Sequence, residues 1–548
     1  MSLQPEALSE IPAETARIAR AAFRKGNVIM RLRDEFGTLY ADADLAHLFP
    51  KRGQPAWSPW RLALITVFQF LEQLSDRDAA DAVRARLDWK YALGLELDNP
   101  GFDHTVLSEF RTRLVEGHAE LLLLDAMLAR FKEHGLLKTR GKQRTDSTHV
   151  LSSVRVLSRY ESLAETLRAA LNQLASTHPE WLMAFIPVDW YSRYGRRIEE
   201  FRLPKGKPER SLYIQQVGRD GFLLLETLER DNALSELWQQ PSVQLLHLAW
   251  SQHFSREGEE VRLKDSNELG PSSERFNSPY DPEARFGAKG TRSWQGYKVH
   301  LTETCDDDFP HLVVHARTAP AAQADIDALL PIHTAVEEKH LPPSEHFVDT
   351  GYVSTEILMA PPPTTGITVI GPARPVSNWQ AKVTGAFSVG DFKVDWQGQQ
   401  VICPQGHIST KWRAHQQPSG RQVISVRFAR RDCLACLVRA LCTRNVSGHA
   451  RELTLLPENL YLARTAQRVV QQSTEWKQAY QRRAGIEGTI SQGVRTCGLR
   501  QTRYRGQAKT ELQESCVASA INIQRVAAWL AGTSRETTRT SRLLALSA

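Results

Sequence analysis

The sequence predicts a mixed α/β core that contains a helical insertion and follows a helical N-terminal region. Five short apolar segments have the β-branched character of strands, and a helical segment, 324–339, lies among them. The predicted strands are 143–154, 295–304, 311–317, 346–349 and 367–370. Helical apolar spacing covers residues 1–140 and much of 157–250. Strands mixed with helices in this order indicate one α/β core.

The composition is that of a large globular protein. The chain has 548 residues, of which 41% are hydrophobic and 24% charged, so it is long enough for several sub-domains. A net charge of +7 permits a polyanionic partner without requiring one. We expect no membrane partner, because no apolar run reaches the length of a bilayer span. We also expect no export, because the first residues lack the basic and apolar regions of a signal peptide.

The N-terminal 140 residues carry clear helix start signals. Ser58 and Pro59 are a typical N-cap and first helical residue, and Ser75 with Asp78 forms a capping box for a second helix. A third short helix is expected from about 105 to 114, with Arg111 and Arg113 exposed. Three short helices that end in a basic one predict a helix-turn-helix-like DNA-binding domain. A plain helical bundle without a ligand explains the same pattern equally well.

The segment 480–505 concentrates basic charge around one acid. Six arginines and a single acid, Glu487, lie between residues 482 and 505. At helical spacing Arg483, Glu487, Ser491 and Arg495 line one face. We interpret Glu487 as a metal-binding carboxylate beside a basic groove that faces nucleic acid. On spacing alone, an ordinary surface ion pair between Arg483 and Glu487 is the alternative.

Two further acids lie on predicted strands. Asp146 is near the start of the strand 143–154, and Asp349 is at the carboxyl end of 346–349. A carboxylate on an apolar strand is costly unless it is paired or binds a cation. With Glu487 these acids supply three oxygen ligands suited to Mg²⁺ or Mn²⁺, and two such ions can promote phosphodiester displacement. The sequence contains no P-loop, dinucleotide fingerprint or HExxH motif.

Four stretches make the chain resemble the DDE transposases of the IS1182 family, within the IS4/IS5-like group. They are TDSTHV at Asp146, GYKVHLTETCD at 296–306, FVDTGY at Asp349, and the segment that carries Glu487. Tyr480, Arg483 and Glu487 match the Y-(2)-R-(3)-E part of that group's signature. The lysine expected seven residues after the acid is replaced by Val494, and we take Arg495 as the substitute cation.

The resemblance implies a fold, a reaction and partners. It implies an RNase H-like sheet with Asp146, Asp349 and Glu487 as metal-binding triad, and Tyr480, Arg483 and Arg495 near DNA. The expected reaction is metal-dependent cleavage at element ends, followed by transfer of the freed 3′-hydroxyl into target DNA. The expected partners are double-stranded terminal inverted repeats, target DNA and at least a second copy of the chain. A bacterial cytoplasmic protein associated with the nucleoid is implied as well.

We therefore expect two domains and a tail. The predicted domains are a helical DNA-binding domain (1–140), a catalytic domain (141–530) with a helical insertion (157–290) and a cysteine-rich insertion (385–455), and a basic tail (531–548). A DNA-binding descendant without chemistry, or a nuclease of the same fold, remains an alternative to an active transposase.

Four of the seven cysteines cluster within forty residues. They are Cys403, Cys433, Cys436 and Cys442, and they include one C-x2-C pair. Four thiolates match a structural tetrahedral zinc site, and His407 competes with Cys403 as a ligand. Reduced buried cysteines without a metal are the alternative. We expect a zinc-knob-like insertion that supports the fold and takes no part in chemistry.

Overall fold

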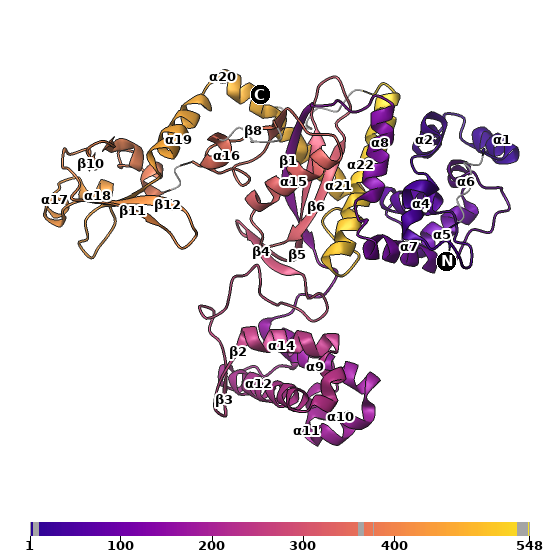
Figure 1. Ribbon diagram of the computed structural model, residues 1–548, viewed down its shortest axis with the longest axis horizontal. Coiled ribbons are helices and arrows are strands. Elements are labelled where there is room, and N and C mark those ends of the chain that lie inside the picture. Colours follow the sequence, from indigo (N-terminus) through magenta and orange to yellow (C-terminus); the bar gives the residue numbers. More distant parts are fainter. Residues whose placement is uncertain (1, 4–9, 360–365, 376–377, 534–545, 547–548) are drawn as a thin grey trace. The chain divides into compact units, whose positions relative to one another are not determined.

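The computed structural model describes residues 2–3, 10–359, 366–375, 378–533 and 546 (Figure 1). The chain divides into two compact units. Unit 1 comprises Met1–Leu341 and Gly485–Ala548, and unit 2 comprises Pro342–Ala484. The predicted mixed α/β core and the helical N-terminal region are both confirmed.

The N-terminal part of unit 1 is helical, as predicted. Its helices are α1 (Ala13–Ala22), α2 (Val28–Phe36), α3 (Asp42–Leu45), η1 (Ala46–Leu48), α4 (Pro59–Leu71), α5 (Asp76–Ala85), α6 (Leu87–Leu93), α7 (Thr105–Glu116) and α8 (Leu122–Glu133). The capping box of Ser75 and Asp78 is present at the start of α5. Ser58 precedes α4, but its hydroxyl donates to Asp42 at 3.1 Å instead of capping the helix.

The sheet of unit 1 is built around the long strand β5 (Arg292–Thr304). β1 (Lys142–Leu151) pairs with it in antiparallel register along one edge, with Asp146 opposite Leu301. β4 (Arg285–Lys289) and β6 (Val313–Pro320) pair with successive parts of the other edge. Helix α15 (Ile326–Glu338) follows β6 and contacts it. β1, β5, β6 and α15 match the predicted segments closely, whereas β4 was not predicted.

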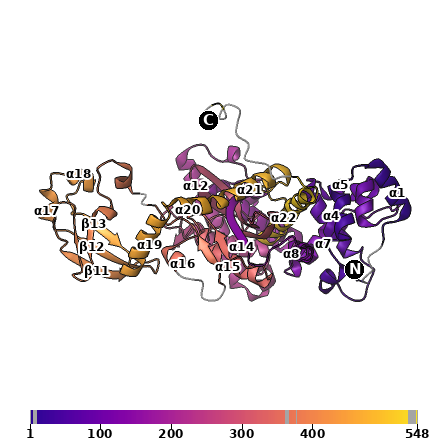
Figure 2. The same ribbon diagram turned by 90° about the horizontal axis from the view of Figure 1, so that it is seen from above.

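The helix α22 (Gln507–Leu530) joins the sheet to the N-terminal helices. It contacts β6, α4 and α8, and the view from above shows it beside α4 and α7 (Figure 2). The sequence of this segment has an apolar stripe at helical spacing that predicts a helix packed on the sheet, and all of its residues except Leu530 are buried: Leu512, Cys516, Ala520 and Ile523. Asn522 of α22 holds β6 through two hydrogen bonds to Val313. Its Oδ1 accepts the backbone N–H of Val313 at 2.7 Å, and its Nδ2 donates to the carbonyl of Val313 at 2.8 Å. Most of the N-terminal helices therefore share one hydrophobic core with the sheet, and α1, α2 and α6 also enclose a small separate cluster.

The predicted helical insertion has its own hydrophobic core. Its helices are α9 (Arg159–Thr177), α10 (Pro179–Phe185), α11 (Val188–Tyr194), η2 (Glu200–Arg202), α12 (Lys207–Arg230), η3 (Asn232–Leu234), α13 (Ser235–Trp238) and α14 (Pro241–His253). The polar sequence of 253–292, with its scattered glycines and prolines, predicts one long loop, and this prediction is wrong. That stretch contains β4 and the hairpin of β2 (Phe254–Glu257) and β3 (Glu260–Leu263), whose strands are short and mostly polar.

Unit 2 begins with β7 (Glu345–Phe347) and β8 (Thr368–Ile370), which pair in parallel. A small β-rich region follows, drawn in orange in Figure 1. The remaining elements of unit 2 are α16 (Thr355–Met359), η4 (Trp379–Lys382), η5 (Val389–Asp391), β9 (Lys393–Asp395), β10 (Gln400–Ile402), β11 (Lys411–Gln416), β12 (Gln422–Arg427), α17 (Arg430–Leu434), α18 (Arg439–Cys442), β13 (Glu452–Leu455), α19 (Glu458–Val470), α20 (Thr474–Tyr480) and η6 (Gln481–Ala484).

Among the described residues, the structure has no helix with both the length and the apolar character needed to cross a bilayer. The predicted basic tail, 531–548, lies mostly outside the described residues.

Candidate active site

A pocket in unit 1 lies between the strand β1 and the helix α21 (Gly485–Thr496). Two of the three predicted acids, Asp146 and Glu487, line it together. The other lining residues are Ser147, Thr148, Ile490, Ser491, Val494, Arg495 and Arg500. Residues that are 341 positions apart in the sequence thus meet in one hollow, as the sequence predicts for a shared site.

Asp146 lies in the middle of strand β1, most of whose residues are buried. The residue is only 7% exposed, and its Oδ1 accepts the backbone N–H of Ser147 at 2.8 Å. A buried carboxylate requires such donors or a cation, because burial penalises its charged form. The position therefore suits a carboxylate with a binding role.

Helix α21 supplies Glu487 in its first turn. Ile486 and Ile490 are buried and fix the inner face of the helix, whereas Glu487 is exposed. The helix starts at Gly485, where a Cβ would lie 2.0 Å from the guanidinium of Arg144. A side chain at this position would require Arg144 to move.

The predicted helical face is shorter than expected. Glu487, Ser491 and Arg495 line the pocket at four-residue spacing, as predicted. Arg483 is not on this helix, because residues Gln481–Ala484 form the 3-10 turn η6. The prediction of one continuous face from Arg483 to Arg495 is therefore wrong.

A buried ion cluster holds α21 against the sheet. Glu303 on β5 is fully buried, and its carboxylate contacts Arg144 and Arg525, each at 2.6 Å. The hydroxyl of Thr489 on α21 donates to the same carboxylate at 2.5 Å. Burial alone would raise the pKa of Glu303, but Arg525 and Arg144 hold it below its ordinary value. Glu303 therefore remains charged and ties α21 to β5.

Two arginines give the pocket a positive wall. Arg495 lies on α21, and Arg500 follows the helix and donates from Nε to the hydroxyl of Thr148 at 2.9 Å. Burial lowers the pKa of the neighbouring His149, and the charges of Arg500, Arg292 and Lys289 lower it further. Sequence reasoning did not single out Arg500, although it is one of the six arginines in the basic segment.

The third predicted acid belongs to unit 2. Asp349 follows β7 by two residues, and its Oδ1 accepts the N–H of Gly351 at 2.7 Å. The hydroxyl of Tyr480 donates to the carbonyl of Val348 at 3.1 Å, and its ring stacks on Trp476. Tyr480 therefore supports the backbone next to Asp349. The predicted triad is divided between the two units, with two members in the pocket of unit 1.

The two arginines predicted on the third N-terminal helix are less exposed than expected. Arg111 is 5% exposed, and it pairs with Asp76 at 2.5 Å and lies over the ring of Tyr504. Arg113 is half-buried over the ring of Phe49. The prediction that Arg111 is exposed is wrong, because its charge neutralises Asp76 inside the fold.

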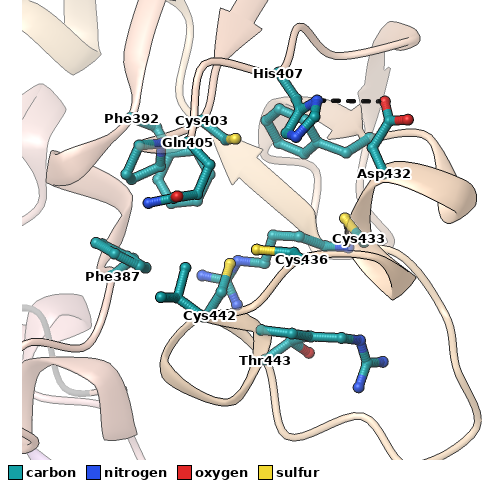
Figure 3. Close-up of a pocket in the computed structure, with 15 residues that line it drawn as sticks. Phe387, Phe392, Cys403, Gln405, His407, Asp432, Cys433, Cys436, Cys442 and Thr443 are labelled. Atoms are coloured by element: carbon teal, nitrogen blue, oxygen red, sulfur yellow. Dashed lines mark hydrogen bonds and ion pairs between the residues drawn. The ribbon is translucent and has the colours of Figure 1, made fainter.

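The four clustered cysteines line a single pocket within unit 2. The pocket also contains His407. The carboxylate of Asp432 lies 3.8 Å from the Nδ1 of this histidine (Figure 3). Burial raises the pKa of the Cys442 thiol; Arg451 opposes this shift, whereas the other three cysteines add to it. The described residues include no group of three or more His, Cys, Asp or Glu side chains already arranged around a metal position.

Comparison with known proteins gives two matches. A family model described as "Transposase DDE domain" matches residues 402–527, and one described as "Transposase domain (DUF772)" matches residues 20–113. These two matches indicate a transposase. The first covers the segment of Glu487 and the cysteines but ends short of Asp146 and Asp349, and the second covers most of the N-terminal helices. No curated protein matches the chain.

A DDE domain implies dependence on a divalent metal ion. The donors in this pocket fit such an ion, because Asp146 and Glu487 are hard oxygen ligands from a strand and a helix. The positive wall formed by Arg495 and Arg500 suits a phosphate group beside them.

Proposed function

We propose that this protein is an IS1182-type transposase that cuts DNA at the ends of a mobile element and joins them to target DNA. The observation that carries the proposal is the shared pocket of Asp146 and Glu487, which also contains Arg495 and Arg500. Carboxylates from a strand and a helix, next to two arginines, suit a site that handles a phosphodiester and a divalent cation together.

The proposed metal ligands are Asp146, Glu487 and Asp349, and Mg²⁺ or Mn²⁺ is the proposed cofactor. When bound, such ions would stabilise negative charge on both the attacking and the leaving oxygen of a phosphodiester displacement. The role of the three carboxylates is to hold the cations. Asp349 completes this set in the proposal as the strand-end acid of unit 2, next to the backbone that Tyr480 supports.

The arginines have a separate role in this proposal. The guanidinium groups of Arg495 and Arg500 bind phosphate oxygens and hold the strand in line for attack. The hydrogen bond from Arg500 to Thr148 fixes its orientation relative to β1, the strand that carries Asp146. Fixed donors need little rearrangement when charge develops during the reaction.

Two successive displacements make up the proposed reaction. In the first, a water oxygen bonds to phosphorus at the element end and the P–O3′ bond breaks, which frees a 3′-hydroxyl. In the second, that 3′-oxygen bonds to a target phosphorus and the target P–O3′ bond breaks. Each step exchanges one phosphodiester bond for another oxygen–phosphorus bond, so the joining step needs no nucleotide cofactor. Joining two ends calls for at least two copies of the chain.

Labelled DNA that carries the inverted repeats flanking the gene tests this function. We expect cleavage at the repeats and joining to a target plasmid in Mg²⁺ or Mn²⁺, and neither reaction in chelator. Glu487→Gln is expected to abolish both reactions while retaining DNA binding. Glu236→Gln, an exposed glutamate of the helical insertion, is the matched control and is expected to be fully active.

Three outcomes would contradict the proposal. Cleavage by Glu487→Gln at the normal rate would remove Glu487 from the metal site. Specific binding of the repeats without cleavage in either metal would indicate a DNA-binding descendant, and cleavage without joining or end preference would indicate a nuclease.

A further inference from the structure

The β-rich part of unit 2 has a small hydrophobic core for its size. This part, residues 388–456, is called here the cysteine sub-domain. Its hydrophobic cluster has only six buried side chains, and the other apolar side chains that pack against them are partly exposed; the six are Phe392, Val401, Val426, Phe428, Leu453 and Leu455. A sub-domain of this size generally needs disulfides or a metal, because so few buried side chains offset little of the entropy lost on folding.

All four cysteines of this sub-domain line the same pocket, although they come from separate elements. Cys403 follows β10, Cys433 lies on α17, Cys436 follows that helix, and Cys442 ends α18. Each of the four is a free thiol that is only partly buried. Figure 3 shows their sulfur atoms around the hollow. Four thiols in one pocket match the ligand number of a structural zinc site.

The backbone around two of these cysteines is arranged as metal-binding turns often are. Cys403 opens a tight turn in which its carbonyl accepts the N–H of Gly406 at 2.8 Å. The backbone N–H of Cys403 donates to the backbone carbonyl of His407 at 2.9 Å. Gly406 has φ of 84°, which a glycine adopts without strain. The N–H of Arg451 points at the Sγ of Cys433 at 3.5 Å. Hydrogen bonds of this kind orient the ligands of a metal site.

His407 is the alternative ligand in the pocket. The Nδ1 of His407 lies 3.8 Å from the carboxylate of Asp432, and Figure 3 marks this contact. Cys403, in the same turn, lines the same pocket. The four sulfurs by themselves complete a tetrahedral set of ligands, so the site does not require the imidazole.

We propose that the cysteine sub-domain binds one structural Zn²⁺ through Cys403, Cys433, Cys436 and Cys442. The thiols surround the pocket without meeting at one point, and no ready-made metal cluster exists among the described residues. Zinc draws the four sulfurs inward to about 2.3 Å from the ion. Zinc binding then adds folding free energy to a sub-domain in which only six apolar side chains are buried. The inference does not depend on the proposed reaction.

Metal analysis of the full-length protein, purified in reducing buffer without chelator, tests this site. We expect about one zinc ion per chain. Cys436→Ala and Cys442→Ala are expected to lose most of it, whereas His407→Ala is expected to keep it. Cys497→Ala is the matched control, because Cys497 is buried in unit 1, far along the chain from this pocket.

A second measurement on the unaltered chain covers the case in which a cysteine variant fails to fold. Metal-free wild-type protein titrated with Co²⁺ is expected to show the intense sulfur-to-metal absorption and the visible bands of tetrahedral four-thiolate cobalt. Zinc added afterwards is expected to displace it. Full zinc content in both cysteine variants, or no thiolate absorption with Co²⁺ in the wild type, would overturn the proposal. Loss of zinc in His407→Ala would show that His407, and not Cys403, is the fourth ligand, and would overturn the proposed set of four cysteines.

Discussion

The hydroxyl of Thr489 donates a hydrogen bond of 2.5 Å to the buried carboxylate of Glu303. Thr489 lies two residues after Glu487 on α21, and Glu303 lies on the central strand β5. The position of the helix that carries one candidate ligand is thus fixed by a charged group inside the sheet. This contact makes the cluster around Glu303 a set of positioning residues for the pocket.

Thr489→Val removes this hydroxyl and keeps the shape of the side chain. We expect a loss of about 1 to 3 kcal/mol in stability, because a buried hydrogen bond to a charged group is lost. We also expect slower cleavage and a higher metal concentration for half-maximal rate, because Glu487 is held less firmly. Thr496→Val, on the same helix but exposed, is the control. An unchanged metal requirement would mean that Thr489 acts on stability alone.

Glu303→Gln removes the charge that Arg144 and Arg525 share. We expect a loss of about 3 to 5 kcal/mol in the free energy of unfolding, because two cations then lose their buried partner. The lowered pKa of Glu303 means that its contribution is present above its ordinary value of 4.5 and disappears as the pH falls below it. Denaturant unfolding at several pH values measures both effects. The exposed pair of Arg262 and Glu268 provides the control, and an equal loss in Glu268→Gln would contradict this explanation.

Buried histidines predict a second pH dependence. Burial lowers the pKa of His300 from 6.5 to about 4, so the folded state keeps this ring neutral. The unfolded chain takes up the proton first, and stability therefore falls as the pH decreases from about 6.5 to about 4. In His300→Gln we expect this slope to be smaller by about 1.4 kcal/mol per pH unit. His247→Gln, at an exposed position, is expected to leave the slope unchanged. The same slope in both variants would show that His300 is not responsible.

Arg500→Ala removes one cation from the wall of the pocket. We expect weaker binding of the element ends and a log–log salt dependence smaller by about one unit, as for the loss of one phosphate contact. Fluorescence anisotropy over a range of salt concentrations measures both. Arg219→Ala, on an exposed face of α12, is the control and is expected to bind like the wild type. An unchanged salt slope in Arg500→Ala would remove this residue from the DNA contact.

Much of the sheet and of the site follows from sequence patterns. The apolar stripe of α22 predicts its burial, and the strands β1, β5 and β6 stand out by their β-branched residues. Asp146 and Glu487 were expected to share a site, and both line one pocket. Such features depend on local periodicity and on residue chemistry, which the sequence contains directly.

The errors come from contacts between distant parts of the chain. Arg111 has the spacing of an exposed residue, but Asp76 lies 35 residues earlier and pairs with it. The sequence does not show which partners Glu303 has, because Arg144 and Arg525 are distant along the chain. An acid within the apolar strand pattern of β5 is nevertheless a signal of a buried ion pair. The break at η6 has no proline to mark it, so helical spacing alone extends the helix of Glu487 back to Arg483.

The most direct test of the proposed metal site exchanges a ligand oxygen for sulfur. In Asp146→Cys and in Asp349→Cys we expect end cleavage to be lost in Mg²⁺ and to be restored substantially in Mn²⁺, which accepts sulfur ligands more readily. Asp146→Ala and Asp349→Ala are expected to stay inactive in both metals. Full activity of either cysteine variant in Mg²⁺, or the same recovery in its alanine counterpart, would contradict a metal-binding role for that carboxylate.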